Sequence, residues 1–424
     1  MNLQDRDSKV IWHPFTQIAT AEKNIPIVRA EGVWLFAENG QKYLDGTASW
    51  WVNAHGHAHP AIAEALAKQA STLEHIIFAG FTHEPAIELA EKLIHLIAGE
   101  QSRIFYSDNG STSVEVALKM ALQYFQNLGK PRKKIIAFEH AYHGDTFGAM
   151  SVGHRNAFSA AFGELLFDVK FVPAPEKYNS AETLDLFSRI VHQNDVAAFI
   201  FEPLVQGANG MRMHDASALS QMIQLAKSNG TITIADEVFT GFYRTGKSFA
   251  TKYLSEQPDI LCLSKTLTGG TLPLGVTAVP EFIYNAFVSE NPMHTFFHGH
   301  SFTANPLSCS AAIASMKLLL ENTCQENILS ISNAHAAFKK LILGNKSIFE
   351  IRHLGTILAI ELNTDAERGY LNPISKEITQ FFLDRNIYLR PLGNVIYITP
   401  PYVISEEELN LIYSAILEFL ETIQ

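Results

Sequence analysis

A lysine and an acid follow two apolar segments of this chain, at Lys265 and Asp236. Residues 231–235 are apolar or β-branched and lead to Asp236, whereas residues 260–263 are apolar and lead to Lys265. Such runs are typical of buried strands, which place the residues after them at the edge of a sheet. Together these residues suit pyridoxal phosphate, which needs an amine for covalent attachment and a carboxylate to keep its ring nitrogen protonated. A buried ion pair is the other interpretation.

A candidate phosphate site lies in residues 106–112, which join a predicted strand to a predicted helix and include Gly110, Ser111 and Thr112. Free N–H groups at a helix N-terminus favour a bound phosphate, and Gly110 allows close approach of the backbone. An ordinary N-cap is the alternative interpretation of this turn. No Gly-Lys-Ser/Thr triplet comes after it, so the turn is not a P-loop.

Further chemistry-bearing residues follow other predicted strands. Tyr142 lies in the segment 140–145, where its ring can cover a flat cofactor, although buried aromatic residues usually belong to a core. Glu202 directly follows a strongly apolar run. Ligands of parallel α/β sheets bind beyond the carboxyl ends of the strands. Because Glu202, Asp236 and Lys265 all lie at such ends, their convergence favours a catalytic site over a structural ion pair.

Aromatic residues, an arginine and several histidines are the remaining candidates. Adjacent Trp50 and Trp51 cannot both point into one core from a strand, so one is expected to line a pocket or an interface. Arg390 can bind a carboxylate through two nitrogens, and a surface ion pair is the equal alternative. Histidine is a common metal ligand, but the histidine clusters lack cysteine and have few nearby carboxylates, so we expect no metal. Those histidines are His55, His57, His59, His298 and His300.

The bulk composition limits the class of protein. The chain has 424 residues, of which 47% are hydrophobic and 18% charged, the balance of an ordinary globular protein. A net charge of −11 argues against nucleic acid or an anionic membrane as partner. The charged N-terminus predicts no signal peptide, and no apolar run is long enough for a bilayer. Three scattered cysteines fit a reducing cytoplasm and exclude a disulfide scaffold.

The alternation of patterns predicts an α/β protein with a mostly parallel sheet, helices on both faces and a smaller α+β domain. Residues 1–59 are expected to form an N-terminal arm with a small-domain hairpin at 33–36 and 42–44, residues 60–302 the large domain, and residues 303–424 the small C-terminal domain. The other predicted strands are 103–107, 134–138, 169–172, 196–201, 231–235, 260–263, 349–352, 356–362, 388–390 and 395–398. The predicted helices are 111–128, 217–228, 306–321, 325–344, 376–385 and 406–422.

These segments, in this order, resemble the class III aminotransferases, which are fold type I pyridoxal phosphate enzymes, over nearly the whole chain. The resemblance is carried by Ile-Ala-Asp-Glu-Val at 234–238, Gly-Phe-Tyr-Arg-Thr-Gly at 241–246 and Leu-Cys-Leu-Ser-Lys at 261–265. A branch of this class that acts in biotin biosynthesis is similar at further segments: 12–16, 49–51, 142–152, 206–213, 390–391 and 396–402. That similarity implies transamination of 8-amino-7-oxononanoate to 7,8-diaminononanoate with S-adenosylmethionine as amino donor.

The resemblance also implies residue roles. Lys265 binds the cofactor covalently and moves the substrate proton, Asp236 pairs with the ring nitrogen, and Tyr142 covers the ring. The other implied cofactor contacts are Gly110, Ser111, Val238, His300 and Ser301, with Ser301 reaching in from the other subunit of a homodimer. The other implied substrate contacts are Phe15, Trp50, Trp51, Asp145, Gly299 and Arg390, and Arg390 would bind the carboxylate of the keto substrate.

Two residues depart from the family pattern. Phe15 stands where the best-known members have tyrosine, and His300 stands where they have proline, which leaves the phosphate contact to Ser301. The amino donor stays open between S-adenosylmethionine and lysine. The alternative is another class III ω-aminotransferase that uses ornithine, γ-aminobutyrate or lysine, but such relatives tend to carry an acid where this chain has Ala208. A pyridoxal-binding scaffold would not need both the lysine and the acid.

Overall fold

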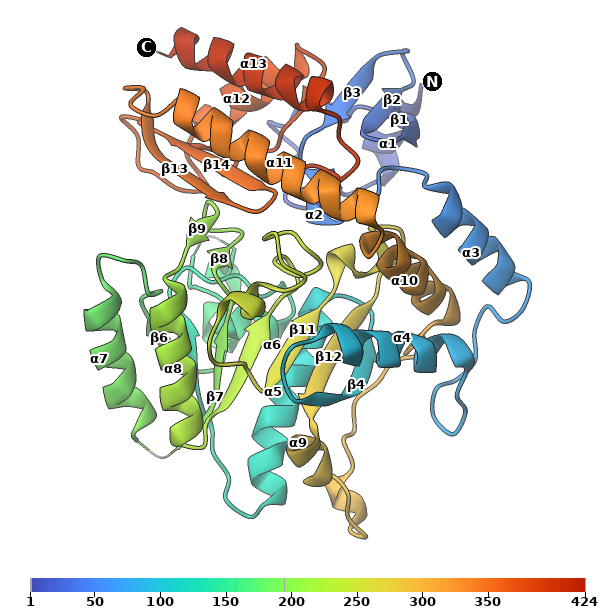
Figure 1. Cartoon of the computed structure of the whole chain (residues 1–424), viewed down its shortest axis with the longest axis vertical. Helices are drawn as coiled ribbons and strands as arrows, with labels where there is room; N and C mark the ends of the chain where they lie inside the picture. Colours follow the sequence, from blue (N-terminus) through green and yellow to red (C-terminus); the bar gives the residue numbers. More distant parts are fainter. Residues whose placement is uncertain (1, 157, 194, 424) are drawn as a thin grey trace.

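The computed structural model describes residues 2–156, 158–193 and 195–423, and a seven-stranded sheet forms the centre of this part (Figure 1). Every residue of its three consecutive strands β7, β10 and β11 is buried, as their unbroken apolar sequences predict. The strands are, in spatial order, β4 (Gln101–Ser107), β12 (Gly275–Pro280), β11 (Ile260–Leu263), β10 (Ile232–Asp236), β7 (Val196–Phe201), β5 (Lys134–Phe138) and β6 (Lys170–Val172).

The large sheet is mostly parallel, as predicted. Strand β12 runs antiparallel to both of its neighbours, β11 and β4, and the pairs from β11 through β6 are parallel. The short sequence 275–280 begins with glycine and ends with proline, so its pattern did not identify it as a strand. All six of its residues are nevertheless buried, and it lies between β4 and β11, with Thr277 opposite Cys262.

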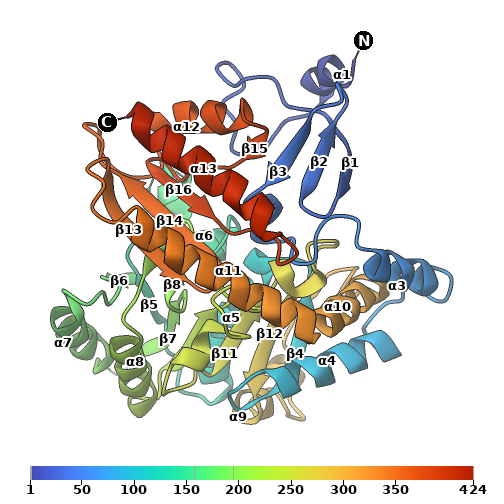
Figure 2. The same ribbon diagram turned by 45° about the horizontal axis from the view of Figure 1, so that its top comes forward.

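Helices cover the sheet and connect its strands (Figures 1 and 2). Helix α5 packs on the central strands, whereas α7 and α8 lie side by side near β6 and β10. These helices are α3 (Pro60–Ala70), α4 (Glu84–Leu96), α5 (Gly110–Asn127), α6 (Phe147–Val152), α7 (Ser180–Val191), α8 (Ala216–Ser228), α9 (Glu281–Asn285) and α10 (Pro306–Leu319). Short elements complete this part: η1 (Ala160–Leu165), η2 (Ala250–Tyr253), η3 (Lys265–Thr268), η4 (Pro292–His294), β8 (Val205–Gln206) and β9 (Arg212–Met213).

A smaller layer, built from the two ends of the chain, lies over the carboxyl side of the sheet (Figure 1). One of its sheets has the order β13-β14-β16 and the other β1-β2-β3-β15. The predicted hairpin is β2 and β3, but the strand predicted at 388–390 is only 387–388, so Arg390 lies beyond it. The bounds are α1 (Leu3–Val10), β1 (Ile27–Glu31), β2 (Trp34–Ala37), β3 (Lys42–Asp45), α2 (Ala48–Trp51), α11 (Asn322–Leu341), β13 (Ile348–Leu354), β14 (Ile357–Leu362), α12 (Ile374–Leu383), β15 (Ile387–Tyr388), β16 (Val395–Ile398) and α13 (Glu406–Thr422).

Pairing between the two chain ends joins this layer. Strand β15 pairs in parallel with β3, with Tyr388 opposite Asp45, and does not join the β13-β14-β16 sheet. Apolar residues of β14, β16, α12 and α13 form one buried cluster with Leu44 of β3. Among the described residues, no helix combines the length and the apolar character that crossing a membrane requires.

Candidate active site

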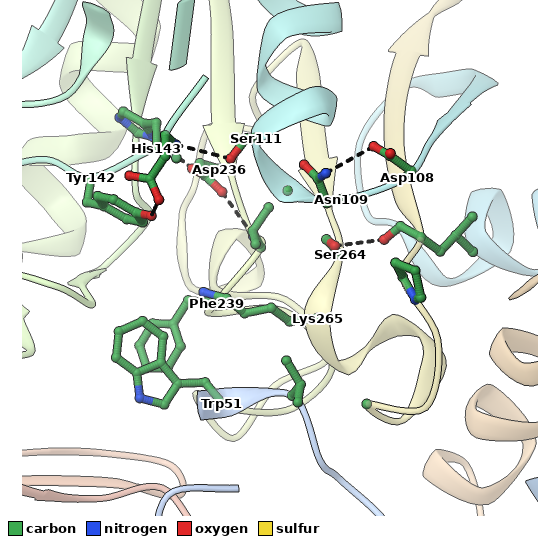
Figure 3. Close-up of a pocket in the computed structure, with 18 of the residues that line it drawn as sticks. Trp51, Asp108, Asn109, Ser111, Tyr142, His143, Asp236, Phe239, Ser264 and Lys265 are labelled. Carbon is green, nitrogen blue, oxygen red and sulfur yellow. Dashed lines mark hydrogen bonds and ion pairs between the residues drawn. The ribbon is translucent and has the colours of Figure 1, made fainter. Parts of the chain in front are cut away.

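The carboxyl ends of the parallel strands surround a cavity of about 650 Å³ (Figure 3). Segments that follow β4, β5, β7, β10 and β11 all contribute to its wall. The predicted site residues that line it are Trp51, Gly110, Ser111, Tyr142, Asp145, Asp236, Val238 and Lys265. The expected convergence of strand ends is therefore present in the structure.

Lys265 enters the cavity directly after β11, from a backbone with φ of 47°. Its Nζ lies 4.5 Å from the ring centroid of Trp51 and 5.6 Å from that of Phe239. Burial lowers the pKa of Lys265 to about 8, although the nearby carboxylates of Asp236 and Glu202 act in the opposite direction. The neutral, nucleophilic form of this amine is therefore far more populated near neutral pH than that of an ordinary lysine, although the protonated form still predominates at pH 7.

Asp236 is buried at the end of β10 and is held by two hydrogen bonds. Its Oδ1 accepts from the backbone N–H of Val238 at 3.1 Å, and its Oδ2 lies 2.7 Å from Nδ1 of His143. Nε2 of His143 is buried without a hydrogen-bond partner among the described residues. A neutral imidazole with its proton on Nδ1 fits this arrangement, because it donates to the carboxylate and leaves no N–H unsatisfied. His143 thus fixes the orientation of Asp236 and leaves the acid its charge.

The N-terminus of α5 has an ordinary N-cap and also faces the cavity, so the two interpretations of this turn are compatible. The side chain of Asn109 caps the helix by accepting from the backbone N–H of Thr112. In return, the backbone N–H of Asn109 donates to the Thr112 hydroxyl at 3.1 Å. Gly110 and Ser111, in contrast, line the cavity, and N–H groups in a first turn have no partner within the helix. A side chain at Gly110 would meet Val238 at 2.7 Å, so glycine is needed here for close packing. The turn offers two N–H groups and the Ser111 hydroxyl to an anion.

Tyr142 and Glu202 both line the cavity and are joined by a hydrogen bond. The Tyr142 hydroxyl donates to Asp145 Oδ2 at 3.0 Å, and its backbone N–H donates to Glu202 Oε1 at 3.0 Å. The second oxygen of Glu202 accepts from the N–H of Gly207 at 2.9 Å. Burial raises the pKa of Glu202 to about 7 despite these bonds. Glu202 therefore fixes the backbone that carries the Tyr142 ring.

Trp50 and Trp51 lie on a left-handed turn and not on a strand. Ala48, Ser49, Trp50 and Trp51 have φ values of 49°, 45°, 70° and 72°. Left-handed helical conformation costs about 1–2 kcal/mol per L-residue, so the surrounding structure must hold this turn. Trp51 is buried in the cavity wall, whereas Trp50 is 38% exposed and points elsewhere. One of the two tryptophans, Trp51, lines a pocket as expected, but the assumed strand is wrong, because a left-handed turn separates the two rings.

Trp50 belongs to a second group beside the cavity. The Phe15 ring lies 5.3 Å from the Trp50 ring, edge to face, and Arg390 Cζ lies 4.4 Å from the Trp50 ring centroid. The structure thus brings together three predicted substrate residues from positions far apart in the sequence. None of the three lines the cavity that contains Lys265.

The segment around Ser301 lies apart from the cavity of its own chain. Gly299 and Ser301 are exposed, and Nδ1 of His300 accepts from the N–H of Phe302 at 3.2 Å. Within the described residues, no group of histidine, cysteine or acidic side chains is arranged to hold a metal ion. His57 instead pairs with Asp45 at 3.0 Å, and His55 lies 3.0 Å from the hydroxyl of Ser315.

Some residues of the site were not identified from the sequence. Phe239 contacts the Trp51 ring at 4.7 Å, and the hydroxyl of Ser264 donates to the carbonyl of Leu274 at 2.7 Å. This bond holds the loop 270–274 at the cavity wall. His143 lies in the segment 142–152 that carries the family resemblance, but nothing in the sequence pairs it with Asp236.

The residues present fit pyridoxal phosphate. The cavity contains a buried amine, a fixed carboxylate, a helix N-terminus that suits a phosphate, and Tyr142 and Val238 as ring-sized walls. The requirements of this cofactor are a lysine, an acid for the ring nitrogen and an anion site, and each is met by a different strand end.

Comparisons with known proteins agree with this assignment. The family model for aminotransferase class III matches residues 17–420. A Synechococcus elongatus protein named adenosylmethionine-8-amino-7-oxononanoate aminotransferase is 49% identical over 421 residues, which are 97% of this chain and 99% of that protein. The crystal structure of a Methanocaldococcus jannaschii protein of the same name is 36% identical, with a TM-score of 0.92 and 98% of both chains covered. A PLP-bound amine transaminase from an uncultivated Pseudomonas species is 28% identical, with a TM-score of 0.90 over 96% of this chain and 97% of that one.

These matches confirm the predicted fold type I architecture and the cofactor. The family model and the Methanocaldococcus jannaschii structure each match nearly the full length of the chain. The matched part therefore includes Lys265, Asp236 and the N-terminus of α5. The chain belongs to the class III aminotransferases and is a transaminase that depends on pyridoxal 5′-phosphate.

Proposed function

We propose that this enzyme transaminates 8-amino-7-oxononanoate to 7,8-diaminononanoate in biotin biosynthesis, with S-adenosylmethionine as amino donor. The observation that carries the proposal is the 49% identity, over nearly the whole of both chains, to a protein named for this reaction. The group formed by Phe15, Trp50 and Arg390 supports it, because it places one cation among aromatic surfaces beside the lysine cavity.

The roles of the residues follow from their positions. Pyridoxal phosphate, when bound, supplies a protonated ring that withdraws electrons from the substrate carbon. Asp236, oriented by His143, keeps the ring nitrogen protonated. Lys265 would hold the cofactor, and its amine is placed to move the proton to and from the substrate carbon. Tyr142, Gly110 and Ser111 line the same cavity, where Tyr142 would cover one face of the ring and Gly110 and Ser111 would hold the phosphate.

The Phe15, Trp50 and Arg390 group suits the two substrates in turn. The keto acid has a carboxylate at the end of an apolar chain, which Arg390 can bind. Adenosylmethionine has a sulfonium and an adenine, which favour aromatic surfaces such as Trp50 and Phe15. Ala208 lines the cavity where ω-aminotransferases of the alternative kind tend to carry an acid, and this favours the biotin-pathway reaction.

A homodimer is part of the proposal. Gly299, His300 and Ser301 lie outside the cavity of their own chain, so their predicted contacts require a second subunit. Ser301 and Gly299 are exposed, as a segment that enters a partner's site would be in a single chain. We place the enzyme in the cytoplasm, where its three cysteines stay reduced.

An amino-donor panel tests the proposed function. Purified enzyme with 8-amino-7-oxononanoate should form 7,8-diaminononanoate with S-adenosylmethionine, and product analysis by mass spectrometry would detect it. Lysine, ornithine and γ-aminobutyrate form the other arms of the panel. Turnover with ornithine or γ-aminobutyrate, but none with 8-amino-7-oxononanoate, would replace the proposal with a general ω-aminotransferase.

Arg390 should act on one half-reaction. Arg390→Ala removes the cation that faces the keto-acid carboxylate, and a hydrogen bond to a charged group contributes about 1.5–3 kcal/mol. We therefore expect weaker binding of 8-amino-7-oxononanoate with little change in the donor half-reaction, measured by single-turnover absorbance of the cofactor. Arg385→Ala, which removes an arginine paired with Glu418 at 2.8 Å, is the matched control. Equal slowing of both halves in Arg390→Ala would assign this arginine to the fold and not to the carboxylate.

The lowered pKa of Lys265 predicts the pH dependence of cofactor binding. The neutral amine attacks the aldehyde, so the rate at which apoenzyme captures pyridoxal phosphate should rise with pH and level off above about 8. Asp236→Asn should move this inflection to lower pH, because the Asp236 charge raises the pKa of Lys265. Stopped-flow absorbance measures both rates, and an inflection near the ordinary lysine value would contradict the burial of this amine.

A further inference from the structure

Asp45 lies at the end of β3, is fully buried, and has both carboxylate oxygens occupied by groups of this chain. Oδ1 accepts from the N–H of Thr47 at 3.1 Å and from the Thr47 hydroxyl at 3.4 Å. Oδ2 accepts from the hydroxyl of Ser49 at 2.7 Å and lies 3.0 Å from Nε2 of His57. Asp45 does not line the cavity, so it has no direct access to the cofactor or the substrate.

The tautomer of His57 follows from its second partner. The side-chain amide nitrogen of Asn53 lies 3.2 Å from Nδ1 of His57, and an amide NH₂ only donates. Nδ1 is therefore the acceptor, and Nε2 carries the proton that is donated to Asp45. Burial alone would raise the pKa of Asp45, but the bonds from His57 and Ser49 outweigh it and hold that pKa below its ordinary value. Asp45 is thus a charged acceptor at the centre of four donors.

These donors lie around the left-handed turn at residues 48–51. Thr47 precedes the turn, Ser49 lies within it, and Asn53 and His57 come after it. L-residues leave this conformation unless the surroundings determine it, and no glycine occupies the turn to relieve the strain. The carboxylate bonds to the entry and the middle of the turn, and through His57 it is tied to the segment beyond.

We infer that Asp45 is a positioning residue, which holds the left-handed turn and thereby directs Trp51 into the cavity and Trp50 towards Arg390. The Trp51 ring lies against Lys265 Nζ, and the Trp50 ring lies against Arg390. The turn therefore positions one tryptophan in the lysine cavity and the other in the group beside it. Asp45 also pairs in register with Tyr388, two residues before Arg390. One carboxylate therefore sets the alignment of the tryptophan pair with the arginine. The link to Arg390 rests on the proposed function, but the link to Trp51 does not.

The fluorescence of Trp51 tests this inference without turnover. In a background of Trp12→Phe, Trp34→Phe and Trp50→Phe, Trp51 is the remaining tryptophan of the chain, and it is 4% exposed. Acrylamide should quench it weakly in the apoenzyme. Adding Asp45→Asn places an amide donor opposite the His57 Nε2–H and removes the charge that accepts from the Ser49 hydroxyl, so the turn should open and the quenching constant should rise several-fold.

Asp259→Asn is the matched control. Asp259 is buried like Asp45 and accepts from the N–H and the hydroxyl of one threonine, Thr233, at 2.8 and 2.7 Å. Its replacement should lower the melting temperature and leave the quenching of Trp51 unchanged. Unchanged quenching in Asp45→Asn, or an equal rise in Asp259→Asn, would overturn the inference.

A compensating change separates positioning from general destabilisation. Ala48→Gly relieves the strain at φ 49° without touching any bond of Asp45, so it should restore much of the shielding of Trp51 in the Asp45→Asn protein. Absence of this rescue would overturn the inference. If Asp45→Asn does not fold, the milder pair Ser49→Ala and His57→Leu takes its place, with His57→Gln as the variant that keeps a donor and should retain shielding. Failure of the donor panel would leave this readout intact.

Discussion

Replacing Lys265 with alanine should abolish transamination while the fold persists. In the proposed function Lys265 attaches the cofactor and moves the substrate proton, and no second lysine lines the cavity among the described residues. General acid–base catalysis alone contributes up to about 10⁴-fold, so we expect at least a loss of that order. Single-turnover kinetics with substrate added to the reconstituted variant would measure it.

Covalent trapping provides the second measurement on this lysine. Borohydride should fix the cofactor to the peptide that contains Lys265 in the wild type and to no peptide in Lys265→Ala. Lys92→Ala, which removes an exposed lysine paired with Glu88 at 3.5 Å, should be trapped like the wild type. Trapping on another peptide would show that the cavity is not the cofactor site.

Replacing Asp236 with asparagine should slow transamination by roughly 100–1000-fold, the usual cost of one removed electrostatic group. The amide can still accept from the N–H of Val238, but it cannot keep a ring nitrogen protonated. It also presents a donor to Nδ1 of His143, which would drive the histidine proton to Nε2, where no acceptor lies within the described residues. Cofactor binding should persist, and absorbance spectra with single-turnover rates would separate binding from catalysis.

His143→Phe is the informative companion to this variant. It removes the hydrogen bond at 2.7 Å but leaves the charge of Asp236, so its rate should fall by less than that of Asp236→Asn. A near-normal rate in Asp236→Asn would make this acid a structural one. A loss in His143→Phe as large as that in Asp236→Asn would mean that orientation of the acid outweighs its charge.

The strand ends were predictable because each depends on local sequence. The runs before Glu202, Asp236 and Lys265 are apolar over their whole length, and a parallel sheet places the residues after such runs at one edge. The class III resemblance then identified the cofactor, which the family match confirms. The roles given to the individual residues, and the domain boundaries at 59 and 302, stay predictions.

Features that depend on distant contacts were not predictable. The left-handed turn at residues 48–51 contains no glycine, so local preferences argue against it. Besides the bonds to Asp45, the turn is held by a hydrogen bond from the hydroxyl of Thr266 to the carbonyl of Trp51, 215 residues apart. Strand β12 has a weak pattern of its own and gains its stability from the two strands beside it. The bond between His143 and Asp236 joins positions 93 residues apart, a separation that no motif in one sequence reveals.

The parallel pairing of β3 with β15 has a consequence for how the protein is made. Leu44 and Asp45 pair with Ile387 and Tyr388, so this contact closes a loop of more than three hundred residues. A ribosome releases Leu44 and Asp45 long before it has synthesised their partners, and such non-local pairings form late in folding. The nascent chain can assemble the large sheet and its lysine cavity first. Arg390 reaches Trp50 only when the last strands are complete. In the proposed function, selectivity for the substrate is therefore acquired after the site for the cofactor.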